Sequence, residues 1–140
     1  MANAFDRVKR TFLFKVMEKF GFRNEVINII KACNGNPWIV PLVKGRPTNF
    51  FQASQGIRKD YPLSPFLYII MPNSLSRKLR ADQNNGLLLG IQMVQAINPL
   101  NHSVFANDSL FLGGASINIA KYFKNTIQQY YSASGGLLDF

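Results

Sequence analysis

The 140-residue sequence contains one cysteine, one histidine, few acidic residues and no long apolar run. Cys33 is the single cysteine, which excludes an internal disulfide and a cysteine-based zinc site. The longest fully apolar run, from Phe66 to Met71, is far shorter than the roughly 20 residues of a transmembrane helix. Acidic residues are also scarce, since 7 Asp and Glu stand against 16 Lys and Arg. We therefore expect no membrane span and an electropositive surface.

The net charge of +9 indicates which kind of molecule the chain is expected to bind. An electropositive surface favours polyanions, so nucleic acid bound without sequence specificity is the expected partner, and a membrane surface is the lesser alternative. Excess charge of this size can also serve solubility alone. The apolar fraction of 47% is sufficient for the core of one domain, and no low-complexity linker or internal repeat divides the chain.

Apolar periodicity and turn residues predict an α+β fold, with an antiparallel sheet and helices packed on one face. Helices are expected over Thr11–Phe20, over Asn24–Cys33, from Ser64 and Pro65 onward, and over about Ile117–Tyr131. Strands are expected over Trp38–Val43, Thr48–Gln52, Gly90–Val94 and Leu137–Phe140.

Several local details accompany these elements. Asn24 is expected to cap the second helix and to precede four buried residues, Val26, Ile27, Ile29 and Ile30. Lys44–Pro47 is expected to join the first two strands as a hairpin loop. Pro72 falls inside the apolar stripe of the third helix (Leu67, Ile70, Met71, Leu75 and Leu79), where a proline costs about 3 kcal/mol.

The segment Val104–Leu112 places Asn107 and Asp108 between two short apolar arms. The pattern predicts a β-hairpin whose two-residue turn is this Asn-Asp pair. A carboxylate at the tip of a buried hairpin has one good reason to be there, which is metal binding, because burying it unpaired is costly. The alternative is that the pair serves the turn alone.

The order of the other segments decides between these interpretations. The chain opens with Ala4–Val8, and Val43–Phe51, Gly56–Phe66, the hairpin and Ser134–Phe140 follow. In this order they resemble the palm of the reverse transcriptase of non-LTR (LINE-type) retrotransposons, particularly plant ones. The corresponding family patterns read approximately AFDxV, VNGxPxxFF, G-[LV]-RQGDPLSP, FADD and SGLxxN.

The resemblance implies an RNA-directed DNA polymerase with a catalytic centre of two Mg²⁺ ions held by carboxylates. Asn107 stands at the position of the principal ligand, and Asp108 stands at that of the accessory acid, which leaves a weak metal site. The first ligand of the family pattern would fall just before Met1. Asp6 matches a second, non-ligand Asp of that pattern, and it is expected to cap the following helix. His102 matches a family histidine but is taken as structural.

The resemblance also implies a set of residues that face nucleotide and template. Phe5 matches an aromatic steric gate against a ribose 2′-hydroxyl, although an aromatic residue by itself is more often a core residue than a gate. Arg58, Pro62 and Ser64 match the family loop, whereas Lys59 and Asp60 stand where the family has Gln and Gly. Two groups of cations are expected to contact nucleic acid: Arg7, Lys9, Arg10, Arg58 and Lys59 beside the cleft, and Arg77, Lys78 and Arg80 on the third helix.

We therefore interpret residues 1–140 as a partial, degenerate reverse transcriptase domain that comprises the palm without fingers or thumb. The chain is expected to bind no productive Mg²⁺ and to be catalytically inactive. Activity would require a partner chain that supplies the missing carboxylate. A non-catalytic basic module that binds RNA or DNA is the alternative, and a chain without a molecular role is a third interpretation. Phe5, Asp6 and the Asn107-Asp108 pair are expected to meet at one edge of a shared sheet.

Overall fold

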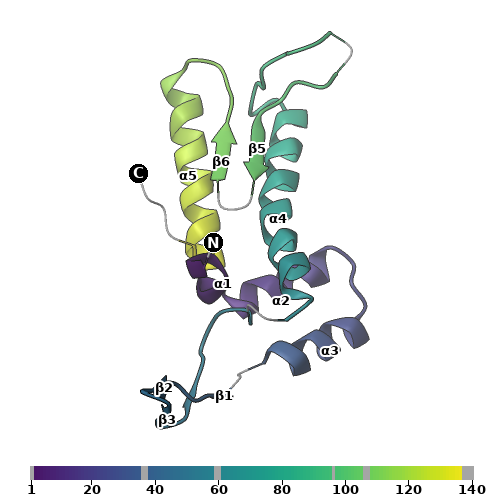
Figure 1. The fold of residues 1–140 in the computed structure, drawn as a ribbon. Helices are drawn as coiled ribbons and strands as arrows, with labels where there is room; N and C mark the ends of the chain where they lie inside the picture. Colours follow the sequence, from purple (N-terminus) through teal and green to yellow (C-terminus); the bar gives the residue numbers. More distant parts are fainter. Residues whose placement is uncertain (1, 36–37, 59–60, 96, 106–107, 137–140) are drawn as a thin grey trace.

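A computed structural model describes residues 2–35, 38–58, 61–95, 97–105 and 108–136. The helices in this part of the chain are α1 (Ala2–Arg7), α2 (Arg10–Lys19), α3 (Asn24–Asn34), α4 (Ser64–Asn84) and α5 (Ile117–Ser134) (Figure 1). The strands are β1 (Trp38–Ile39), β2 (Leu42–Val43), β3 (Arg46–Pro47), β4 (Phe51–Gln52), β5 (His102–Phe105) and β6 (Asp108–Phe111). The α+β class expected from the sequence is confirmed. Among the described helices, none has the length and apolarity to cross a membrane.

Helix α4 connects two hydrophobic clusters along its length. Leu67 and Met71 belong to the first cluster, together with buried residues of α2 and α3. Leu75 and Leu79 belong to the second cluster, which also contains Leu88, from the segment after α4, and Phe123, from α5. The apolar stripe expected for this helix is thereby confirmed. Pro72 lies inside α4, between the two clusters, as the sequence predicts.

Helices α2 and α3 form where the periodicity predicts them. Leu13 and Ile27 are almost completely buried between them. The expectation that Val26 and Ile29 are buried is wrong, because these side chains are 40% and 63% exposed. Helix α3 packs through the face that carries Ile27 and Ile30, and its other face lies in solvent. The helix begins at Asn24, but the prediction that Asn24 is its N-cap is wrong, because the N-cap is Arg23.

Residues 38–52 form a two-stranded ribbon, which we call the β-arm. At the base of the arm, β1 pairs with β4, so that Trp38 lies opposite Gln52 and Ile39 lies opposite Phe51. At the tip of the arm, β2 pairs with β3, and Lys44 and Gly45 form the turn between them, with φ angles of +52° and +75°. A two-residue turn with positive φ at both positions matches the twist of the flanking strands. The hairpin is therefore confirmed, but its predicted four-residue loop, Lys44–Pro47, is wrong.

The second hairpin lies between α4 and α5 (Figure 1). Its register pairs Phe105 with Asp108, so Asp108 is the first residue of β6 and not part of the turn. The prediction that Asp108 lies in the turn is therefore wrong, and Asn107, the other residue of the predicted turn, lies outside the described residues. An isolated bridge between Ile91 and Leu100 forms where the strand Gly90–Val94 is expected. The expected closing strand, residues 137–140, lies outside the described residues.

The opening segment does not join the hairpin in a sheet. Phe5 and Asp6 lie in helix α1, and β5 and β6 form a ribbon of their own. The predicted shared sheet is therefore wrong among the described residues, where the strands form separate two-stranded ribbons. Asp6 also does not cap α2, because the N-cap of that helix is Lys9.

Candidate functional site

Two motif segments meet at the junction between α1 and α2. The backbone N–H of Gly56 donates to the Val8 carbonyl at 2.9 Å, and that of Ile57 donates to the Phe5 carbonyl at 2.8 Å. Gly56 has a φ of +94°, and a Cβ there would lie 2.9 Å from the Asp6 carbonyl oxygen. Glycine is therefore required for this close approach of the two backbones.

The end of α5 reaches the same junction. The backbone N–H of Lys9 donates to the Ser134 carbonyl at 2.8 Å, and the Lys9 ammonium donates to the Ser132 carbonyl at 2.7 Å. Gly135 has a φ of +91°, and a Cβ there would overlap the Arg7 carbonyl oxygen. Three of the segments on which the resemblance rests therefore converge on residues 5–9.

Ser64 holds the loop that precedes α4 and cannot contact a ligand with its side chain. Its hydroxyl donates to the Arg58 carbonyl, and its N–H donates to the Tyr61 carbonyl at 2.9 Å. The residue is completely buried. Arg58 and Pro62 are exposed on the same loop, and Lys59 lies outside the described residues.

Phe5 is half-buried at the edge of the first cluster. Its ring lies 5.0 Å from the ring of Tyr68, at an interplanar angle of 32°. This contact gives the ring a packing role, and its function as a steric gate stays a prediction.

Asp108 is exposed at the start of β6. Strand β5 runs toward the end of the molecule that carries α1 and α2, and β6 runs back from that end (Figure 1). In the part of the chain that the structure describes, no group of three or more His, Cys, Asp or Glu side chains could hold a metal ion. Mg²⁺ requires several hard oxygen ligands in octahedral geometry. The described residues therefore do not fit the Mg²⁺ centre that the resemblance implies.

Several of the cations expected at a nucleic-acid surface are engaged within the protein. Arg10 is 7% exposed, and its guanidinium donates to the carbonyl of Asn34 at 3.0 Å and to the carbonyl of Ala53. The expectation that Arg10 contacts nucleic acid is therefore wrong. Burial also lowers the pKa of this guanidinium. Arg77 stacks on the ring of Phe20, with 4.0 Å between its guanidinium carbon and the ring centroid.

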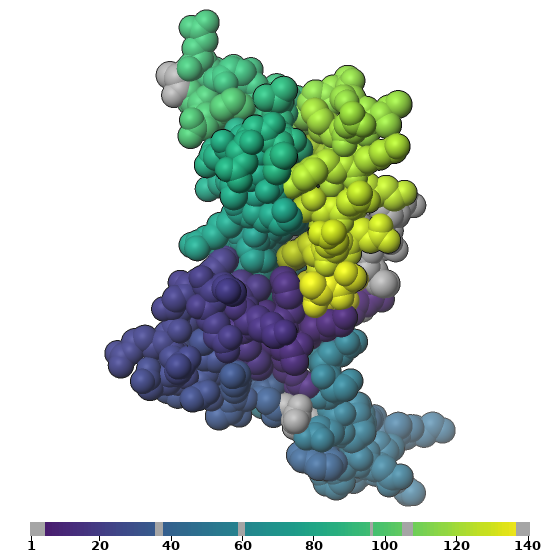
Figure 2. Space-filling model, turned by 180° about the vertical axis from the view of Figure 1, so that it is seen from behind, coloured from purple at the N-terminus to yellow at the C-terminus, as the bar shows by residue number. Residues whose placement is uncertain are grey.

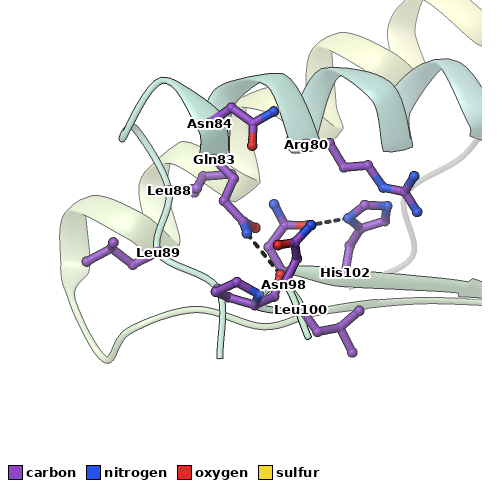
Figure 3. A pocket seen from close by; sticks show the side chains of 11 residues that line it. Arg80, Gln83, Asn84, Leu88, Leu89, Asn98, Leu100 and His102 are labelled. Atoms are coloured by element: carbon purple, nitrogen blue, oxygen red, sulfur yellow. Dashed lines mark hydrogen bonds between the residues drawn. The ribbon is translucent and has the colours of Figure 1, made fainter. Parts of the chain in front are cut away.

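A cleft of about 640 Å³ opens beside the end of α4. Figure 3 shows Arg80 and His102 on one wall and Gln83 and Leu89 among the other lining side chains. The Gln83 amide donates to the Pro99 carbonyl at 2.9 Å, and the Asn101 amide donates to the Leu79 carbonyl at 2.9 Å. These amides hold the chain before β5 against α4.

The same region contains a polar group that the sequence analysis did not assign. The Lys78 ammonium lies 2.8 Å from a carboxylate oxygen of Asp82, and the Tyr122 hydroxyl donates to that oxygen. Burial would raise the pKa of Asp82, but the hydrogen bonds from Lys78 and Tyr122 outweigh burial and lower this pKa. The i,i+4 spacing of Lys78 and Asp82 is the sequence signal for the pair. Similarly, Arg10 shares a helical face with Leu13 and Met17, which is the signal for its burial.

Acid is expected to destabilise the fold in two stages. Burial, together with nearby Arg80, lowers the pKa of His102 below its ordinary 6.5, so the unfolded chain binds this proton more tightly. Stability should therefore be fully present above pH 6.5 and fall below it. A further loss should follow below the ordinary Asp82 value of 3.8, as the pH falls toward the lower pKa of the folded state.

Urea unfolding followed by circular dichroism between about pH 8 and pH 3 measures this dependence. In Asp82→Asn, the acid-dependent loss below pH 4 should shrink. A parent chain that is more stable at about pH 4 than at pH 7 would contradict the assignment.

Comparison with known proteins gives two relatives, and no family model matches the chain. The chain is 26% identical over 136 residues to a retrovirus-related Pol polyprotein from type-1 retrotransposable element R2 of Popillia japonica. This alignment covers 97% of the chain and 21% of that polyprotein. The chain is also 33% identical over 72 residues to an uncharacterized mitochondrial protein of Arabidopsis thaliana, across 51% of this chain and 59% of that protein.

The similarity to the Pol polyprotein indicates a retrotransposon-related origin for this chain. The chain spans about a fifth of the polyprotein's length and about three-fifths of the mitochondrial protein's length.

Proposed function

We propose that this chain is a remnant of the RNA-directed DNA polymerase of a plant LINE-type retrotransposon, and that it contains part of the palm and is catalytically inactive. The observation that carries the proposal is the similarity to a retrotransposon Pol polyprotein along 97% of the chain. The convergence of three motif segments on residues 5–9 supports it, because these segments are far apart in the sequence.

The proposed inactivity rests on the chemistry of nucleotidyl transfer. Two divalent ions must clamp the attacking oxygen, the leaving oxygen and the phosphates, and carboxylates must hold those ions. Asn107 offers an amide oxygen without the negative charge that offsets the ion. In the loop that the resemblance assigns to nucleotide binding, Lys59 and Asp60 stand where the family has Gln and Gly, and an aspartate does not allow the close backbone approach that glycine allows. Asp108 alone cannot hold two divalent ions.

The purified chain is expected to extend no primer on an RNA or DNA template with Mg²⁺ or Mn²⁺ and all four nucleotides. The variant Asn107→Asp should also be inactive, because one restored carboxylate does not complete a two-metal centre. Gel analysis of a labelled primer measures the product, with an active reverse transcriptase as the positive control. Primer extension that disappears in Asp108→Ala would overturn the proposed inactivity.

The second candidate function is a non-catalytic module that binds RNA or DNA. Its specific support is the net charge of +9 together with exposed cations such as Arg58, Arg80 and Lys121. Phosphate contacts by such residues release counterions, and they do so without reading the base sequence.

Binding to a labelled oligonucleotide is expected to be weak and to fall steeply as salt rises. Each phosphate contact contributes a slope of about −0.7 to the plot of log affinity against log salt for a single strand. Arg58→Gln should reduce the magnitude of this slope, whereas Arg10→Gln should act mainly on stability because Arg10 is buried. Fluorescence anisotropy at several salt concentrations measures both. Affinity that does not change with salt would contradict this mechanism.

A further inference from the structure

The β-arm projects from the rest of the molecule at the end opposite the β5–β6 hairpin (Figures 1 and 2). Apart from half-buried Val40, all of its residues are exposed. The Thr48 N–H and hydroxyl both donate to the Pro41 carbonyl at 2.9 Å, which joins the tip to the base. Between this contact and the Ile39–Phe51 pair, Asn49 and Phe50 oppose Val40 alone, so the ribbon contains a β-bulge.

Large aromatic side chains are unusually exposed on this arm. Trp38 is 68% exposed, Phe50 is 69% exposed and Phe51 is 48% exposed. Because Trp38 pairs with Gln52 and Ile39 pairs with Phe51, the side chains of Trp38 and Phe51 lie on opposite faces of the ribbon. An isolated two-stranded ribbon has no second layer to cover either face, so both faces carry an exposed ring that a ligand can contact.

All charged side chains of the arm are positive. Lys44 and Arg46 lie at its tip, Arg58 follows its base, and residues 38–58 contain no acid. Aromatic rings combined with cations along an exposed surface match the chemistry of single-stranded nucleic acid, in which bases stack on rings and phosphates pair with cations. A duplex keeps the faces of its bases stacked on one another, so it offers phosphates to the cations but no free base faces to the rings.

The backbone conformation of Lys44 in the turn indicates that its positive charge has a role. Its φ of +52° lies in the left-handed region, which asparagine and glycine adopt at lower cost than lysine does. Lysine is therefore a poor choice for the stability of this turn, yet it places a cation at the tip of the arm.

The base of the arm is held from both sides. The Arg10 guanidinium donates to the carbonyl of Asn34, which precedes the arm, and to the carbonyl of Ala53, which follows it. This clamp fixes the position of the arm on α2, so rings at its base are held in place before a ligand arrives.

We propose that the β-arm binds single-stranded nucleic acid by stacking bases on Trp38, Phe50 and Phe51 and by pairing phosphates with Lys44 and Arg46. This inference rests on the second candidate function and assigns it a surface. The site lies apart from the hairpin that carries Asp108.

Trp38 is the single tryptophan of the chain, so its fluorescence reports on the arm alone. Titration of the full chain at low salt with a 15-nucleotide oligo(dT) should quench this fluorescence, and a matched duplex should quench it much less. The anisotropy of the same oligonucleotide, carrying a dye, measures total binding in parallel. Phe51→Ala should weaken binding by about fivefold or more.

Lys44→Asn separates binding from stability. It should raise the melting temperature, because asparagine suits the turn, and it should weaken oligo(dT) binding. Lys121→Gln removes one exposed cation from α5 and should weaken binding less than Lys44→Asn does.

Oligonucleotide binding that leaves Trp38 fluorescence unchanged would overturn this inference while preserving the nucleic-acid-binding function. Absence of binding in both measurements would overturn the inference and that function together. A Trp38 signal that follows protein concentration without oligonucleotide would assign the arm to self-association, and this outcome would also overturn the proposal.

Discussion

Replacing Gly135 with alanine is expected to lower the free energy of unfolding by about 3 kcal/mol or more. Gly135 ends α5 with a φ of +91°, where an L side chain is strained. The added Cβ would also overlap the Arg7 carbonyl oxygen, which belongs to backbone and cannot rotate away. The end of α5 would have to move from the α1–α2 junction and lose the hydrogen bond between Lys9 and Ser134. Urea unfolding of the purified chain measures the change.

Gly21→Ala is the matched control for this prediction. Gly21 follows α2 with a φ of +83°, but a Cβ there meets nothing within 4 Å. It should therefore cost only the backbone strain, about 1 kcal/mol. Equal losses for Gly21→Ala and Gly135→Ala would show that the close approach to Arg7 contributes nothing to the stability of the fold.

Replacing Arg10 with methionine is expected to lower the free energy of unfolding by about 3 kcal/mol. The substitution keeps much of the apolar stem but removes the two hydrogen bonds to the carbonyls of Asn34 and Ala53. A hydrogen bond from a charged donor contributes about 1.5–3 kcal/mol, and losing the donor leaves buried carbonyls unsatisfied. Because these carbonyls flank the β-arm, limited proteolysis should also cut the arm faster.

Lys15→Met provides the comparison on the same helix. Lys15 is exposed on α2, so its replacement should change the free energy of unfolding by no more than about 0.5 kcal/mol. If Arg10→Met were as stable as Lys15→Met, with an equally resistant arm, the proposed clamp would be wrong.

The long helices were predictable because their signals are local. Helix α4 begins at Ser64 with Pro65 in its first turn, and its buried residues repeat at helical spacing. Helix α2 ends before Gly21, whose positive φ few other residues adopt readily. These signals depend on residues within one or two helical turns, and so they can be recognised without knowing which other segments pack against the helix.

The short ribbons were predicted with errors in their turns. The loop Lys44–Pro47 proved to be a two-residue turn, and Asp108, which was predicted to lie in the turn of the second hairpin, is the first residue of β6. A one-residue shift turns each side chain of a strand to the other face, so register depends on which face is buried. In β6, Asp108 and Leu110 are exposed and Phe111 packs against the second cluster, but the adjacent apolar residues Leu110 and Phe111 give no alternation in the sequence that reveals this register.

The sequence by itself determined the α+β class, the positions of the long helices and the surplus of positive charge, because these follow from composition and local periodicity. Only the tertiary structure decided how that charge is distributed between the interior and the surface. Arg10 is buried and holds the chain at the two ends of the β-arm, whereas Lys44 is exposed at the tip of the arm, although both residues are simply cations in the sequence. Burial and hydrogen-bond partners come from segments far along the chain, such as Ala53 for Arg10 and Arg7 for Gly135. The helical face that Arg10 shares with Leu13 and Met17 indicates its burial, but no local pattern identifies these distant partners, and so the packing of the whole chain decides them.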